Sequence, residues 1–305
     1  MTVLEKQIAD YLYYCECQKK LSNKTIKAYR IDLSQFAVLT AKETIPLTKA
    51  CITEYVQRLH TQYKPKSVKR KVATLKAFVN YLEFDGKIAE NPLNKLRLGF
   101  KESVVLPKAL SLGTIKHLLS TVHNSLRDTS SEYKRKANIR DIAVLELLFA
   151  TGLRVSELCS VLSSQIDLRE GHVKVVGKGA RERIVFITNS EVLHALRLYK
   201  KMFLQQINST GWFFVNRLGN KLSEQSVREM VKKYTNQAGI ADHITPHIIR
   251  HSFATLMLEE DVDIRYIQSI LGHSSISTTQ IYTHVSMSKQ RKIMARKHPR
   301  NRFLL

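Results

Sequence analysis

The stretch ITPHIIRHSFAT, residues 244–255, joins a helix start to side chains that can hold and protonate an anion. Pro246 is well placed to open a helix, because its fixed φ suits the first helical position. His247 and Arg250 are three residues apart and so share one face of that helix. His251 follows His247 by four residues, as in a zinc-binding helix, but Ile248 stands where the H-E-x-x-H motif needs a glutamate. The spacing therefore favours a cationic site over a zinc site.

A second stretch, LGHSSISTTQIYTH at residues 271–284, places a histidine nine residues before a tyrosine. Taken singly, His273 in a Gly–Ser turn is a local hydrogen-bonding residue, and Tyr282 is a core or interface residue. Close to clustered positive charge, however, a tyrosine becomes a plausible nucleophile, because a cationic site favours its phenolate form.

A third stretch, TGLRVSEL at residues 151–158, puts Arg154 at the start of a helix with Glu157 one turn further on. The plain interpretation is a surface Arg–Glu pair. An arginine in the first turn opposes the helix dipole, however, so an anionic partner would account for it.

Residues 172–187, HVKVVGKGARERIVFI, have apolar residues at alternate positions, Val173 and Val175 and then Ile184 and Phe186, on the two sides of a Gly/Lys/Arg turn. This pattern predicts a β-hairpin with a cationic tip that includes Lys178 and Arg181. The simplest interpretation of Lys178 is a solvated turn residue, but its flanking glycines let a ligand approach the backbone closely.

Two other kinds of site are not favoured by the sequence. The spacing of the glycines around Lys178 does not fit a nucleotide-binding P-loop. Asp261 and Asp263 fit a polar turn with a helix cap better than a two-metal site, since no further carboxylate is evident.

The chain has 305 residues, and its 49 Lys and Arg against 26 Asp and Glu give a net charge of +23 at pH 7. Both 1–105 and 106–305 are basic, which is typical of a long surface that holds nucleic acid.

A membrane of anionic lipid is the alternative partner for a basic surface. Proteins that bind such membranes usually have a juxtamembrane basic cluster or an amphipathic anchor. No run approaches the ~20 apolar residues of a membrane span, and the N-terminus lacks signal-peptide order. We therefore expect a cytoplasmic protein with no membrane partner and four reduced cysteines.

Apolar residues recur at helical spacing through residues 1–97, with a cap at Ser22 or Asn23 before one helix. A later helix has a basic face, which is either simply solvated or in contact with phosphates. Residues 98–110 are expected to be an extended linker, and residues 123–138 a long loop or a solvated helix end. The basic face, which we predict to bind DNA, consists of Lys66, Lys69, Arg70, Lys71 and Lys76.

Together with the closing KHPRNRF, these motifs resemble those of the tyrosine recombinases, closest to the Xer and transposon/integron integrase branch. LSNKTIKAYRIDLSQF, residues 21–36, likewise resembles the N-terminal domain of that branch. The resemblance implies that Arg154 and Arg250 clamp the scissile phosphate and that Lys178 protonates the leaving 5′-hydroxyl. It further implies that His247 is the general acid/base at the tyrosine oxygen, His273 donates a hydrogen bond to the phosphate, Tyr282 attacks, and Glu157 supports the arginines. No metal and no cofactor is implied.

The elements predicted along the chain give the architecture, a mainly α protein with a small β-sheet in its C-terminal domain, and the resemblance implies that its two domains clamp DNA. We expect a helical, SAM-like core-binding domain (1–97), the linker (98–110) and a catalytic domain (111–305) that together clamp double-stranded DNA at a specific recombination site. Four protomers are expected on two sites in the nucleoid, with residues 288–305 docked into a neighbour or, alternatively, in contact with DNA. The resemblance leaves open whether a second recombinase or an accessory protein is also a partner. The rival functions are a non-catalytic DNA-binding module and a type IB topoisomerase-like relaxing enzyme.

Overall fold

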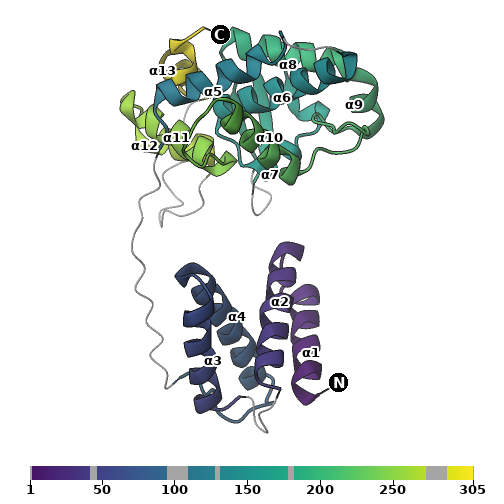
Figure 1. Cartoon of the computed structure of the whole chain (residues 1–305), viewed down its shortest axis with the longest axis vertical. Helices are drawn as coiled ribbons and strands as arrows, with labels where there is room; N and C mark the ends of the chain where they lie inside the picture. The colour runs from purple at the N-terminus through teal and green to yellow at the C-terminus, as the bar shows by residue number, and fades with distance from the viewer. Residues whose placement is uncertain are drawn as a thin grey trace. The chain divides into compact units, whose positions relative to one another are not determined.

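The computed structural model of the chain describes residues 2–41, 47–94, 109–127, 131–177, 182–272 and 287–304, with side chains of the last range from residue 291. The chain divides into two units, Met1–Val105 and Leu106–Leu305 (Figure 1). Each unit has its own hydrophobic core.

Four helices are described in the N-terminal unit, and most begin at a side chain that caps them. Thr2, Ser22 and Thr48 each accept a hydrogen bond from the backbone three residues on, and Pro65 occupies the first turn of the fourth helix. Each helix contributes a buried stripe to one core, as its apolar spacing predicts. The helices are α1 (Val3–Cys17), α2 (Asn23–Leu39), α3 (Lys49–Gln62) and α4 (Pro65–Phe84).

A buried ion pair joins α2 to α4 inside this unit. Asp32 is 1% exposed and Lys71 is 3% exposed, and the Lys71 Nζ lies 3.0 Å from Asp32 Oδ1. The Asp32 carboxylate also accepts from Thr74 and pairs with Arg70. Lys71 was predicted to lie on the DNA-binding basic face, and its burial shows that this prediction is wrong. Its ammonium is used inside the unit to neutralise Asp32 and cannot contact DNA as a surface group.

The C-terminal unit is built around α6 (Glu132–Thr151), which contacts helices on several sides. All of residues 141–151 are buried, as expected for a helix that is covered all round. The elements around it are α5 (Leu112–Asn124), α7 (Val155–Cys159), η1 (Ser163–Gln165), α8 (Ser190–Met202), α9 (Leu204–Thr210), α10 (Glu224–Gln237), α11 (Pro246–Glu259), α12 (Ile264–Leu271), α13 (Met287–Lys297) and η3 (Pro299–Arg302).

The start of α6 corrects one expectation. Residues 123–138 were expected to be either a long loop or a solvated helix end. The first of these two predictions is wrong. Ser131 caps a helix that begins at Glu132, and the exposed side chains of its first turns explain the polar composition. Asn138 donates to the carbonyl of Ser125, which ties the end of α5 to α6.

A three-stranded antiparallel sheet completes the unit, in the order β1 (Ile166–Asp167), β2 (His172–Val176) and β3 (Glu182–Phe186). The hairpin predicted from alternation is confirmed, with Val173 opposite Val185 and Val175 opposite Arg183. Its tip, residues 178–181, lies outside the described residues. The mainly α fold with a small sheet is therefore as predicted.

The C-terminal segment packs on its own unit. Arg300 is fully buried, and its guanidinium forms two 2.9 Å hydrogen bonds to the buried Glu146 and one of 2.7 Å to Glu191. Met294 and Phe303 are buried beside it. The unit thus contains a binding site for its own C-terminal segment. The predictions from the sequence were only docking into a neighbouring protomer or contact with DNA. Docking into a neighbour stays a prediction.

The Asp32–Lys71 pair should carry much of the stability of the N-terminal unit. Asp32→Asn leaves a buried ammonium without its counter-charge, so we expect a loss of about 3–5 kcal/mol in the free energy of unfolding. The sole tryptophan, Trp212, lies in the other unit. In urea, the far-UV ellipticity should therefore show an earlier transition while the Trp212 fluorescence transition stays in place. Asp10→Asn, which breaks a partly exposed pair with Lys87, is the matched control and should change little.

His298 should make the stability of the C-terminal unit depend on pH. Burial lowers the pKa of its imidazole from 6.5 to about 4. Between these values the unfolded chain binds a proton that the folded chain does not, so stability falls by about 3 kcal/mol as the pH falls through this window. His298→Asn keeps a side-chain acceptor for the Arg300 N–H and does not titrate. Urea midpoints of Trp212 fluorescence at several pH values should show a shallower slope for this variant. The exposed-residue variant His194→Asn should keep the wild-type slope, and equal slopes for all three proteins would contradict the prediction.

Candidate active site

Glu157 is the centre around which the predicted phosphate-binding residues gather. It lies in the first turn of α7, where its Oε2 accepts from the backbone N–H of Arg154 at 2.9 Å. Its Oε1 accepts from Arg154 Nη1 at 2.8 Å. The predicted Arg154–Glu157 pair is therefore present, and the Arg154 side chain is still 40% exposed, so its guanidinium can also contact a substrate.

Arg250 reaches the same carboxylate from a different helix. Thr245 caps α11 and Pro246 occupies its first turn, which places Arg250 one turn inside. Its guanidinium donates to the carbonyls of Gly152 and Leu271, both at 2.8 Å, and lies 3.9 Å from Glu157. Burial, followed by the charge of Arg154, lowers the pKa of Arg250 to about 10, so it is charged at neutral pH.

Arg183 is the third arginine of this cluster and was not among the site residues predicted from the sequence. Its Nη1 and Nη2 donate to the two oxygens of Glu157 at 3.1 and 2.8 Å. The signal was present in the hairpin register: Val175 and Val185 are buried, and Arg183 pairs with Val175 on the same face as Val185. An arginine on the apolar face of a strand needs an internal counter-charge, and Glu157 supplies it.

The electrostatics of the cluster keep Glu157 ionised. Burial by itself raises the pKa of this carboxyl, but the hydrogen bonds and charge of Arg183, and then those of Arg154, outweigh burial and hold the pKa below its usual value. A carboxylate shared by three cations leaves a net positive cluster. Such a cluster attracts an anion such as a phosphodiester.

The remaining predicted residues are only partly placed. His247 is exposed in the first turn of α11, three residues before Arg250. Lys178, Arg181, His273 and Tyr282 lie outside the described residues. The structure therefore brings together Arg154, Glu157 and Arg250.

On the N-terminal unit, the predicted basic face of α4 is exposed except for Lys71. Arg70 is on this face while also pairing with Asp32. The exposed members are Lys66, Lys69, Arg70 and Lys76.

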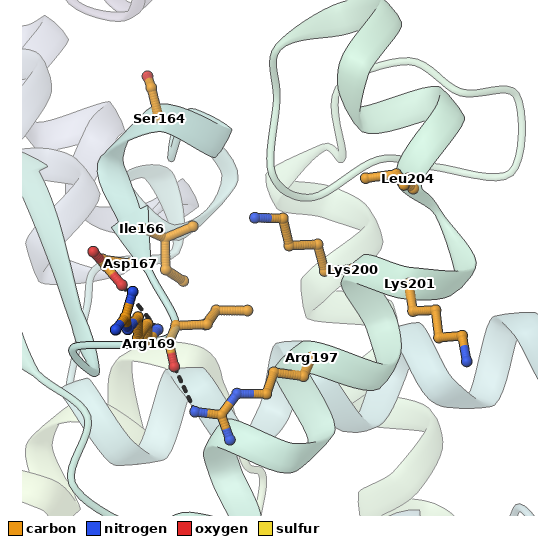
Figure 2. A pocket seen from close by; sticks show the side chains of 9 residues that line it. Ser164, Ile166, Asp167, Arg169, Arg197, Lys200, Lys201 and Leu204 are labelled. Atoms are coloured by element: carbon orange, nitrogen blue, oxygen red, sulfur yellow. Dashed lines mark hydrogen bonds between the residues drawn. The ribbon is translucent and has the colours of Figure 1, made fainter.

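A basic hollow of about 770 Å³ lies elsewhere on the C-terminal unit (Figure 2). Arg197 donates to the carbonyl of Leu168 at 2.6 Å, and Lys200 extends toward Ile166. None of the predicted site residues lines this hollow. It adds positive charge to the unit but shares no residue with the Glu157 cluster.

Among the described parts of the chain, no group of three or more His, Cys, Asp or Glu is arranged to hold a metal ion. Within the same residues, no helix has both the length and the apolar character to cross a membrane.

Two family models match the chain. Residues 115–289 match the phage integrase family, and residues 8–86 match the phage integrase N-terminal SAM-like domain. Among solved structures, a λ integrase fragment bound to a COC′ core site has a TM-score of 0.68 at 18% identity, covering 93% of this chain and 100% of the fragment. XerH bound to difH has a TM-score of 0.66 at 19% identity, covering 94% and 82%. At these identities the likeness shows the fold.

Sequence relatives are closer. A tyrosine recombinase of Agathobacter rectalis is 47% identical over 304 residues, which is 99% of each chain. Tyrosine recombinase XerD of Listeria monocytogenes is 36% identical, covering 96% of this chain and 98% of that protein. Tyrosine recombinase XerC of Thermodesulfovibrio yellowstonii is 34% identical, covering 98% of both. The chain therefore belongs to the phage integrase family, among its tyrosine recombinases.

Proposed function

We propose that the Glu157 cluster is the phosphate-binding half of the active site of a site-specific DNA recombinase. The observation that carries this is the convergence of Arg154 and Arg250, from two separate elements, on one buried carboxylate. Two guanidinium groups held in this way can bind the non-bridging oxygens of a phosphodiester and neutralise the charge that grows on them during substitution at phosphorus.

The proposed reaction is a transesterification that needs no cofactor. The Tyr282 oxygen attacks phosphorus and the bond from phosphorus to the 5′ oxygen breaks, leaving a 3′-phosphotyrosyl link. Lys178 protonates the leaving 5′ oxygen, while His247 accepts the tyrosine proton and His273 donates a hydrogen bond to the phosphate. Attack by a 5′-hydroxyl of a partner strand reverses the step and rejoins the DNA. The energy of the broken bond is kept in the phosphotyrosine, so no nucleotide is consumed.

The proposed substrate is double-stranded DNA that carries a specific site. Solved recombinases of the same fold are described as bound to a core site, to difH and, as a λ integrase tetramer, to a Holliday junction. The net charge of +23 supports a polyanionic partner. We assign backbone contacts to the exposed cations of α4 and to Arg181 at the hairpin tip.

The proposed assembly has four protomers on two sites, acting on DNA of the nucleoid in the cytoplasm. Residues 1–97 and 111–305 would hold the duplex and 98–110 would link them. Because the protomers are identical, the site that binds residues 298–303 within one protomer also exists on its neighbour, which supports exchange of the tail. A second recombinase or an accessory protein would join this assembly. The relatives, named tyrosine recombinases, do not favour the architectural-module or relaxing-enzyme alternatives.

Loss of the Tyr282 oxygen should abolish the covalent step alone. Wild-type protein and Tyr282→Phe are incubated, in excess EDTA, with a pool of nicked duplexes of randomised and host-flanking sequence. We expect a denaturing gel to show a 3′-linked adduct only for wild type, while both proteins retain the same DNA in a filter assay. Sequencing the trapped strands gives the site. An adduct with Tyr282→Phe would assign the nucleophile elsewhere, and binding without any wild-type adduct, even after host extract is added, would favour the architectural module.

Lys178 should be dispensable when the leaving group needs no proton. We expect Lys178→Ala to slow cleavage of the ordinary site by about 10²–10⁴-fold, the usual contribution of a general acid. A substrate with a 5′-thiol leaving group, which departs as a thiolate, should restore most of the rate. Arg154→Ala is the control, because the thiol cannot replace phosphate binding. If the thiol substrate fails to rescue Lys178→Ala, the general acid is another residue.

A further inference from the structure

We propose that Arg183 is a positioning residue for this reaction, which fixes the C-terminal end of α12 to the carboxylate that holds Arg154. The inference rests on the proposed function and adds a residue that lies within the quoted stretch 172–187 but was given no role there. Arg183 is not assigned any contact with the substrate.

The contacts of Arg183 join two parts of the site. Its Nε donates to the carbonyl of Ile270 at 2.7 Å, while Nη1 and Nη2 hold both oxygens of Glu157. The side chain is only 12% exposed, so these bonds are shielded from water. One planar guanidinium thus connects β3, α7 and α12.

Three consecutive carbonyls at the end of α12 are each held by a different arginine. Arg183 binds the carbonyl of Ile270, Arg250 that of Leu271, and Arg154 that of Gly272 at 3.2 Å. These are carbonyls that a helix leaves without internal partners at its C-terminus, where the helix dipole favours cations. The arginines that bind phosphate are therefore tied to the point where α12 ends.

Gly272 brings this end of the helix directly against Arg183. Its φ of +65° ends the helix in the left-handed region. A Cβ at this position would lie 2.9 Å from Arg183 Nη1 and 3.1 Å from Cζ, so any side chain here would displace the Arg183 guanidinium as well as strain the backbone. The next residue in the chain is His273, and Tyr282 follows nine residues later. This contact fixes the position of Gly272, the residue to which that segment is joined.

Only an arginine can make this connection. Its rigid fork donates sideways through Nε and forward through both Nη atoms, so it binds Ile270 and Glu157 together. A lysine would keep the charge but would present a single ammonium to either partner. Arg183→Lys therefore removes the connection while preserving the charge of the cluster.

The test measures the rate at which the covalent protein–DNA adduct forms in a single turnover. The substrate is a nicked duplex that carries the recombination site found by sequencing the trapped strands. We expect Arg183→Lys to lower the rate constant at saturating DNA by about 10- to 100-fold, the size of effect that a 1 Å misplacement of reacting groups produces. The dissociation constant for the duplex and the final adduct yield should stay within about two-fold of wild type, since only the positions of the reacting groups change.

Two further variants complete the test. Arg140→Lys is the matched control, because Arg140 is 14% exposed and binds a carboxylate of the same unit, Asp141, away from the cluster. It should keep the wild-type rate constant. Combining Arg183→Lys with Glu157→Gln should cost no more than the more damaging single change, because both act through one connection.

The outcomes separate the possibilities. An unchanged rate constant for Arg183→Lys overturns the inference, as does a fall in yield alone, which indicates partial misfolding. Weaker DNA binding with an unchanged rate at saturation assigns Arg183 to the DNA interface and also overturns it. If wild-type protein forms no adduct, the proposed function fails and this inference fails with it.

Discussion

The arrangement of the C-terminal unit depends on one carboxylate, that of Glu157, shared by three arginines. Arg154, Arg183 and Arg250 come from the start of α7, from β3 and from α11, and without a negative charge between them they would repel one another. The same arginines also bind the last carbonyls of α12. A single buried acid therefore sets the mutual positions of four elements that are far apart in the sequence.

A buried carboxylate joins separate elements through basic side chains at two further places in this chain. Asp32 joins α2 to α4 through Lys71, and Glu146 on α6 joins the C-terminal segment to the core through Arg300. In each case the acid is almost fully buried and accepts from more than one donor. Buried pairs of this kind add little net stability compared with apolar residues, but breaking one is costly, so they specify which elements meet.

Much of this could be predicted from the sequence, for local reasons. The hairpin followed from recurring apolar residues on both sides of a Gly/Lys/Arg turn and the Ser22 cap from its side chain, and Arg154 and Glu157 are neighbours because they lie one helical turn apart. Lys71 and Arg183 could not be placed in this way. Both look like surface cations in one dimension, and only the partner helix or the strand register reveals the carboxylate that draws them inside. The start of α6 was left open between a loop and a solvated helix end, because the side chains of its first turn, residues 132–135, are all exposed.

The anchoring of Arg300 makes the last codons of the gene as sensitive as those of the core. A nonsense mutation at any codon from 283 to 300 would spare every proposed reacting residue, yet it would leave the buried Glu146 without its main cation. The carboxylate would then keep only its hydrogen bond with His123, and a buried acid that has lost its main counter-charge is costly or takes up a proton. Such a truncated chain would be removed by cellular proteases rather than persist as an inactive competitor of the intact protein.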